Sequence, residues 1–257
     1  MKNLKFIEWQ NDATTATVWL NRPPVNAVNS QMYLEIQELF GNLATYCPEA
    51  RAIVLAGRGK HFCAGNDLKE FESMNPENAP ARMKEVREAF WAIYDSPIPV
   101  IAAVHGAAVG AGLGIAASCD LIVAADDAKF GLPEINVGVM GGAKHLSRLV
   151  PEGMVRLMYY TGDLVEAKRL QPFGGIVDIV QADELLNAAQ DLARAVAHHS
   201  PIALRFAKRN LNAIEYQDLK AGYEFEQKST AELSGYADSK EAVNAYLEGR
   251  APVYTGR

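Results

Sequence analysis

Residues 99–114 read PVIAAVHGAAVGAGLG. Val100–Val104 is a short apolar run typical of a buried strand, and the glycine-bearing turn Gly106–Gly114 follows it and opens a helix. A second strand pattern, Leu121–Ala124, comes directly after that helix. This rhythm of strand, turn and helix predicts an α/β fold built from successive β-β-α turns.

A second glycine turn, residues 62–69 (FCAGNDLK), follows the apolar run Ala52–Ala56 and also leads toward a helix. A helix N-terminus presents unpaired amides and a partial positive charge, which a developing oxyanion needs. Two such turns that converge would form an oxyanion hole. The alternative is that the glycines only allow tight packing of helix on strand.

The chain begins with a predicted hairpin, Leu4–Trp9 and Thr15–Leu20, around a turn at residues 10–12. A helix follows, capped by Asn29 or Ser30. Residues 74–80 are polar and rich in turn formers, so they are a candidate lid between a helix near Leu68 and one over residues 81–92. The expected apolar stripe of the capped helix is Met32, Leu34, Ile36, Leu39, Phe40 and Leu43.

Beyond about residue 183 the apolar periodicity is helical and strand signals are few. We therefore divide the chain into a core, residues 1–182, and a helical C-terminal region, residues 183–257, that packs on the core or on neighbouring subunits. The helices expected there are Leu185–Val196, Ile202–Ile214, Leu219–Leu233 and Asp238–Glu248.

Composition excludes several classes of protein. With 257 residues, 49% of them hydrophobic and 22% charged, the chain can bury a large core. A net charge of −6 disfavours nucleic acid as a partner. The longest apolar run, Ile98–Ala117, contains a proline, a histidine and glycines, so we expect no membrane span.

Three widely spaced cysteines, Cys47, Cys63 and Cys119, suit free thiols in a reducing compartment and have no metal-ligand spacing. No apolar leader follows Met1. We expect a cytoplasmic protein that begins near Met1 and holds no metal.

Several further motifs accompany the two turns, in an order and at spacings that resemble the crotonase (enoyl-CoA hydratase/isomerase) family. The resemblance runs nearly end to end and implies the family's spiral of β-β-α turns with a helical C-terminal trimerisation region, assembled as a homotrimer or a dimer of trimers. The motifs are residues 21–23 (NRP), 26–28 (NAV), 64–69 (AGNDLK), 99–106 (PVIAAVHG), 130–138 (FGLPEINVG), 160–162 (YTG) and 246–252 (YLEGRAP).

The resemblance also implies the ligand, a coenzyme A thioester that binds as substrate, with no permanently bound cofactor. The backbone amides of Asn66 and Ala111 would hold the thioester oxygen. Arg22 is a candidate phosphate partner, although an arginine before a proline on a loop can equally be solvated. The remaining residues expected to clasp the coenzyme are Val25, Ala27, Ala64, Asp67, Leu68 and Gly110.

Family hydratases use two glutamates, and this chain keeps only the second, Glu134, with Gly114 at the position of the first. Two carboxylates allow one to activate water while the other delivers a proton, whereas one carboxylate can still shuttle a proton between two carbons. Simple hydration is therefore in doubt. Glu134 could alternatively be a surface or capping carboxylate that follows a proline.

The segment after Glu134 is shorter than the family's usual proline- and glycine-rich turn, which should reshape the acyl pocket. Met140 and His145 are candidates to line that pocket, and His145 could supply a proton near neutral pH. His145 could instead be a packing or capping residue. Tyr223 could reach the pocket from the C-terminal region or fill a helix's apolar face.

We expect an enzyme, foremost a lyase or isomerase of CoA thioesters in which Glu134 moves the proton. Two alternatives stay open. One is a thioester hydrolase or decarboxylase on the same fold, in which the oxyanion hole does most of the work. The other is an acyl-CoA-binding protein without turnover.

Overall fold

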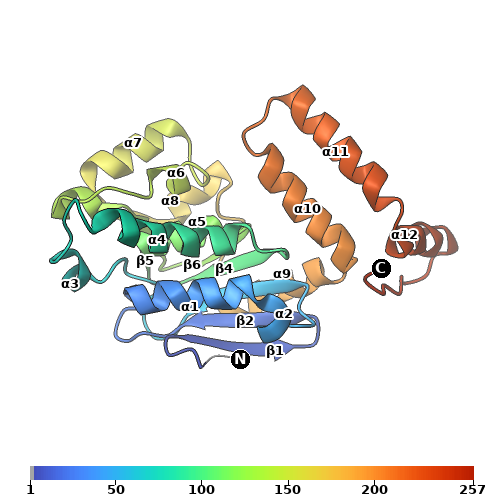
Figure 1. Cartoon of the computed structure of the whole chain (residues 1–257), viewed down its shortest axis with the longest axis horizontal. Coiled ribbons are helices and arrows are strands. Elements are labelled where there is room, and N and C mark those ends of the chain that lie inside the picture. The colour runs from blue at the N-terminus through green and yellow to red at the C-terminus, as the bar shows by residue number, and fades with distance from the viewer. Residues whose placement is uncertain (1–2) are drawn as a thin grey trace.

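The computed structural model describes residues 3–257, so the expected start near Met1 lies outside the described residues. Within that range the main sheet has six strands in the order β1-β2-β3-β4-β6-β9 (Figure 1). The first two strands are antiparallel and the others are parallel. The strands are β1 (Ile7–Asp12), β2 (Thr15–Leu20), β3 (Ala52–Gly57), β4 (Val100–Val104), β6 (Leu121–Ala125) and β9 (Asp178–Val180).

A smaller sheet, in the order β5-β7-β8, lies beside the main one and contains β5 (Ala107–Val109), β7 (Lys129–Gly131) and β8 (Val165–Glu166). β4 in the main sheet is followed by β5 in the small sheet, and β6 by β7 in the same way. Each turn of the chain therefore contributes one strand to each sheet, as the predicted β-β-α spiral requires.

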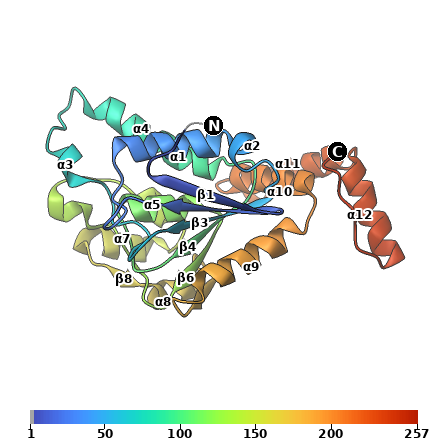
Figure 2. The ribbon, with the colours of Figure 1, turned by 90° about the horizontal axis from the view of Figure 1, so that it is seen from below.

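Helices cover both faces of the main sheet. α1 (Ser30–Gly41) and α4 (Ala79–Tyr94) lie together on one face, and α9 (Leu185–Ala197) lies on the other (Figure 2). The central parallel strands β3, β4 and β6 are buried almost throughout and consist almost wholly of apolar residues, as expected for strands covered on both faces, whereas the edge strand β9 is partly exposed. The short helices between them are α2 (Leu43–Tyr46), α3 (Leu68–Phe71), α5 (Ala111–Ser118), η1 (Pro133–Val137), α6 (Ala143–Leu146), α7 (Glu152–Thr161), α8 (Ala167–Leu170) and η2 (Gln171–Phe173).

The last three helices form an arm that extends to one side of the core (Figures 1 and 2). They are α10 (Pro201–Ile214), α11 (Leu219–Leu233) and α12 (Ala237–Glu248), close to the expected ranges. The buried ammonium of Lys208 on α10 lies 2.6 Å from Asp120 in the core, which anchors the base of the arm. The division at residues 182/183 stays a prediction, and α9 itself packs on the main sheet.

Two local expectations were wrong. The first hairpin turns at Ala13, which has a φ of 46°, because β1 continues through residues 10–12 in register with β2. On α1, Leu34 is 45% exposed, whereas Tyr33 is buried and takes part in the core. The expected cap is confirmed, since the Asn29 side chain accepts from the amide of Met32. No helix among residues 3–257 is long and apolar enough to cross a bilayer.

Candidate active site

The first glycine turn places Asn66 by pairing its neighbours with the chain near the N-terminus. The amide of Val28 donates to the Gly65 carbonyl (2.8 Å), and the amide of Asp67 donates to the Val28 carbonyl (2.9 Å). These bonds form a parallel bridge between Val28 and Asn66. In such a bridge the central residue's own N–H points to the opposite side, so the Asn66 amide is turned away from Val28.

The second glycine turn places Ala111 at the first position of α5. Gly110, the N-cap, has φ 54° and ψ −117°, a conformation that essentially only glycine adopts. The Ala111 amide belongs to the first turn of the helix and therefore has no intrahelical acceptor. Because α5 is wholly buried, its N-terminal dipole acts at this point with little screening by water.

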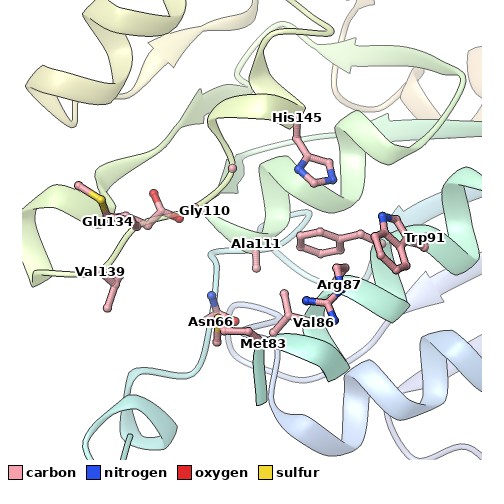
Figure 3. Close-up of a pocket in the computed structure, with 14 residues that line it drawn as sticks. Asn66, Met83, Val86, Arg87, Trp91, Gly110, Ala111, Glu134, Val139 and His145 are labelled. Atoms are coloured by element: carbon pink, nitrogen blue, oxygen red, sulfur yellow. The ribbon is translucent and has the colours of Figure 1, made fainter. Parts of the chain in front are cut away.

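The two turns converge as the sequence predicts. Cys63 and Ala108 form a parallel bridge, and a Cβ built on Gly110 would lie 3.8 Å from Cα of Gly65. The amides of Asn66 and Ala111 therefore border one space (Figure 3). Their assignment as the oxyanion hole stays a prediction.

Glu134, on η1, points at the same place. A Cβ on Gly110 would lie only 2.6 Å from Oε1 of Glu134, so the absence of a side chain there makes room for the carboxylate. Among residues 3–257, the buried Oε2 of Glu134 has no hydrogen-bond partner. Burial raises the pKa of this carboxyl above its ordinary value. A buried carboxylate oxygen without a partner is suited to exchange protons with a ligand, which disfavours the alternative of a surface cap.

Two cavities meet at Glu134 and share Asn66, Gly110 and Val139 on their walls. The coenzyme cavity, as we name the larger one of about 380 Å³, is lined by expected coenzyme residues and by the end of η1. The acyl cavity, of about 200 Å³, lies toward α4 and α6 (Figure 3). Of the predicted residues, Val25, Ala27, Ala64, Asp67 and Leu68 line the first, and Ala111, Met140 and His145 line the second.

Arg22 lines neither cavity. Its guanidinium donates to the Ala27 carbonyl (2.7 Å) and to Asp67 (2.5 Å), and this contact lowers the pKa of Asp67. Arg22 thus fixes two walls of the coenzyme cavity relative to each other. Its predicted contact with a phosphate stays a prediction, and the hydrogen bonds it already makes leave fewer donors for one.

His145 stacks edge-on against Phe90, with ring centroids 5.0 Å apart. Burial lowers the pKa of His145, so the neutral imidazole is favoured near pH 7. Tyr223 is 59% exposed on α11 and lines neither cavity, so the structure assigns it neither of the two places expected for it.

The structure explains the glycine at position 114. A Cβ at Gly114 would lie 2.7 Å from Cε2 of Phe90, a separation that real side chains do not reach. Phe90 is buried, so its ring must shift toward the acyl cavity that it lines before position 114 can hold a side chain. The aromatic ring occupies the space that a carboxylate at position 114 would need.

The sequence alone did not single out the residues that α1 and α4 bring to the site. The buried Tyr33 donates a hydrogen bond to Oδ1 of Asn66 at 2.5 Å, while Arg87 and Trp91 line the acyl cavity. Apolar spacing within the helix at residues 81–92 could have indicated an inward face. Nothing in the sequence shows which cavity that face borders.

Among residues 3–257, no group of three or more histidine, cysteine or acidic side chains could hold a metal ion. The three thiols are buried and free. Burial raises the pKa of Cys63 to about 12, so the thiol nearest the site is protonated and unreactive near neutral pH.

Comparison with known proteins agrees with this geometry. A family model described as enoyl-CoA hydratase/isomerase matches residues 10–257. Proteins named (7aS)-7a-methyl-1,5-dioxo-2,3,5,6,7,7a-hexahydro-1H-indene-carboxyl-CoA hydrolase are similar. The one from Rhodococcus jostii RHA1 is 38% identical, with 92% of each chain covered. The one from Mycobacterium tuberculosis H37Rv is 40% identical, with 86% of this chain and 90% of that protein covered.

Among solved structures, an enoyl-CoA hydratase subunit of Geobacillus kaustophilus HTA426 is similar over 100% of both chains, with a TM-score of 0.91 and 33% identity. The chain belongs to the enoyl-CoA hydratase/isomerase family, and its spiral fold is the crotonase fold. It is an enzyme of the class that acts on acyl-CoA thioesters.

Proposed function

We propose that this chain hydrolyses a carbon–carbon bond in the acyl group of an oxo-acyl-CoA thioester, with Glu134 as the single acid and base. The observation that carries the proposal is the buried Glu134 carboxylate, whose Oε2 has no protein partner where the two cavities meet. The chain has a glycine at position 114, where the Phe90 ring fills the space of a side chain, so we assign the chemistry to one carboxylate. The names of the two similar hydrolases support a proposal of hydrolysis over the lyase or isomerase expected from the sequence.

One carboxylate suffices to hydrolyse the bond between the α- and β-carbons of a thioester that carries a ketone at its β-carbon. Glu134 takes a proton from water, and the water oxygen adds to the ketone carbon. The bond between the α- and β-carbons then breaks, and its electron pair passes into the thioester as an enolate. Glu134 returns the proton to the α-carbon. The products are a new carboxylic acid and an intact CoA thioester.

The same arrangement of backbone amides beside Glu134 can stabilise the enolate. The amides of Asn66 and Ala111 border the space beside Glu134, where they can donate to the thioester oxygen as negative charge develops on it. We assign the substrate's coenzyme part to the cavity lined by Val25, Ala27 and Leu68, and its acyl part to the cavity toward α4. This chemistry draws on side chains, backbone amides and water alone.

A second candidate is a Δ3,Δ2-enoyl-CoA isomerase, in which Glu134 moves a proton between the α- and γ-carbons. The unpartnered Oε2 also favours this reaction, because it needs a single base and no water. Cleavage at the thioester carbonyl is a further outcome, distinguished by release of free coenzyme A.

The test is a panel of acetoacetyl-CoA, 2-oxocyclohexane-carboxyl-CoA, 3-hexenoyl-CoA and crotonyl-CoA, with products identified by mass. We expect 2-oxocyclohexane-carboxyl-CoA to gain one water and one esterifiable carboxyl group while it keeps coenzyme A, and acetoacetyl-CoA to give acetyl-CoA and acetate. Glu134→Gln should lower kcat by about two to four orders of magnitude with little change in affinity. The matched control, Glu184→Gln, alters an exposed glutamate outside both cavities. If 3-hexenoyl-CoA is the one substrate of the panel that is converted, the reaction is isomerisation and the proposed hydrolysis is wrong.

A further inference from the structure

One face of α4 forms a wall of the acyl cavity and runs from the buried Phe90 to Arg87 and Trp91, which are exposed at the edge of the cavity. Met83, Val86, Arg87, Phe90 and Trp91 all line it, spaced i, i+3, i+4, i+7 and i+8 along the helix (Figure 3). This spacing is a single helix face, which in most helices is uniformly apolar. Four of the five residues follow that rule, and the fifth is an arginine.

Within the described range, residues 3–257, Arg87 carries no ion pair. Among residues 3–257 its one specific contact is with the Trp91 ring, whose centroid lies 5.2 Å from Cζ. The nearby cations differ, because Arg82 binds Glu70 and Lys84 lies 3.5 Å from Glu88. The Arg87 guanidinium therefore has hydrogen-bond donors to offer a ligand.

The charge of the cavity depends on Arg87. The other titratable side chains on its wall are Glu134 and His145. Burial favours the neutral form of each, raising the pKa of Glu134 and lowering that of His145. The positive charge on the wall thus comes from Arg87, which is on α4, while the reacting carboxylate is on η1.

We propose that Arg87 binds an oxygen acceptor, a ketone or a carboxylate, at the end of the acyl group remote from the thioester. Trp91, which is 52% exposed, packs against the hydrocarbon in between. The proposal deepens the proposed function and rests on its placement of the acyl group in this cavity. A guanidinium fork can bind a carboxylate with two parallel hydrogen bonds and a ketone with one.

The coenzyme phosphates are a poorer partner for Arg87. The coenzyme cavity lies on the other side of Glu134 and does not include α4 in its wall. A thioester held at Asn66 and Ala111 directs its acyl group toward Phe90 and Trp91. The group that reaches Arg87 is therefore part of the acyl chain.

The experiment measures Kd by calorimetry for three saturated thioesters, so turnover is not needed. Hexanoyl-CoA ends in a methyl group, 5-oxohexanoyl-CoA carries a distal ketone, and adipyl-CoA carries a distal carboxylate. Wild type should bind at least one oxygen-bearing ligand about tenfold more tightly than hexanoyl-CoA, the typical effect of a hydrogen bond to a charged group. If only adipyl-CoA binds more tightly than hexanoyl-CoA, the group that Arg87 binds is a carboxylate. If 5-oxohexanoyl-CoA does so as well, Arg87 binds either kind of oxygen acceptor.

Variants separate the guanidinium from charge in general. Arg87→Ala should abolish the preference and leave hexanoyl-CoA within about twofold of wild type, while Arg87→Lys should retain part of it for the carboxylate. The matched control is Lys84→Ala, which removes a cation from the same helix outside the cavity wall and should keep the full preference. Circular dichroism checks that each variant is folded.

Two results overturn the inference, namely no preference in wild type or a full preference in Arg87→Ala. Failure of hexanoyl-CoA to bind would contradict both this inference and the proposed function. If all three ligands bind with the expected pattern but no oxo-thioester is hydrolysed, the proposed hydrolysis is wrong and the role of Arg87 in binding stands.

Discussion

The ring of Phe90 occupies the space that a side chain on Gly114 would need. A Cβ on Gly114 would lie 2.7 Å from Cε2 and 2.8 Å from Cζ of Phe90. The residue on α4 and the residue on α5 are therefore coupled. A carboxylate at position 114 therefore requires the ring at position 90 to shift or to be removed.

The first prediction follows from that coupling. Gly114→Ala should lower the free energy of unfolding by about 1–3 kcal/mol because it overpacks the core. Gly114→Glu alone should not create crotonyl-CoA hydration. Gly114→Glu with Phe90→Ala should allow a second carboxylate and measurable hydration, followed as loss of the conjugated thioester's absorbance.

The control for the double variant is Gly114→Gln with Phe90→Ala, which has the same volume and no acid. Equal hydration by both double variants would show that the carboxylate is irrelevant. Hydration by Gly114→Glu alone would contradict the steric role of Phe90.

The second prediction concerns pH. Glu134 acts as a base only when ionised, and burial raises its pKa. The kcat/KM should therefore fall as pH drops through a value above the ordinary glutamate pKa of about 4.3. His145→Gln should keep this acidic limb, since the pKa of His145 is lowered and its neutral form persists near pH 7. If kcat/KM of His145→Gln no longer falls at acidic pH, the base is His145 and not Glu134.

The same shift predicts a stability difference. A carboxyl whose folded-state pKa is raised opposes folding once pH exceeds its unfolded pKa, and below that value it has no effect. Glu134→Gln should thus be at least as stable as wild type at pH 7, with the difference disappearing in acid. Chemical denaturation at the two pH values measures this. A loss of stability at pH 7 would mean that the carboxylate has a stabilising partner in the folded protein.

The glycine turns could be predicted from local sequence, whereas Glu134 and the other expected cavity residues were predicted from the resemblance to the family. Gly65 and Gly110 adopt positive φ, and such positions are marked by the glycine itself. Tyr33, Phe90 and Arg87 act through contacts between α1, α4 and the turns, and these contacts are set by packing between distant segments. A helix's periodicity predicts its inward face, and it carries no information about which ligand that face meets.

The third prediction concerns Tyr33, whose hydroxyl donates to Oδ1 of Asn66 at 2.5 Å. This bond fixes the side chain of Asn66, the residue whose backbone amide is the expected oxyanion donor. Tyr33→Phe and Asn66→Ala should each lower kcat on the best substrate by about tenfold, the effect of one hydrogen bond. The double variant should be no worse than either single one, because both remove the same interaction. Additive losses would show that Tyr33 acts independently of Asn66.

The last prediction concerns assembly. The arm exposes large apolar side chains, with Leu219 and Tyr246 both 87% exposed and Leu247 76% exposed. Surfaces of this kind are usually covered in the working protein, and here the family resemblance predicts a trimer or a dimer of trimers. Sedimentation at micromolar concentration should show that assembly.

Tyr246→Glu with Leu247→Glu should weaken the assembly, because two charges would be buried. Leu34→Glu, a control on the exposed side of α1, should leave it unchanged. A wild-type monomer would contradict the prediction, and an intact assembly in the double variant would place the contact elsewhere on the chain.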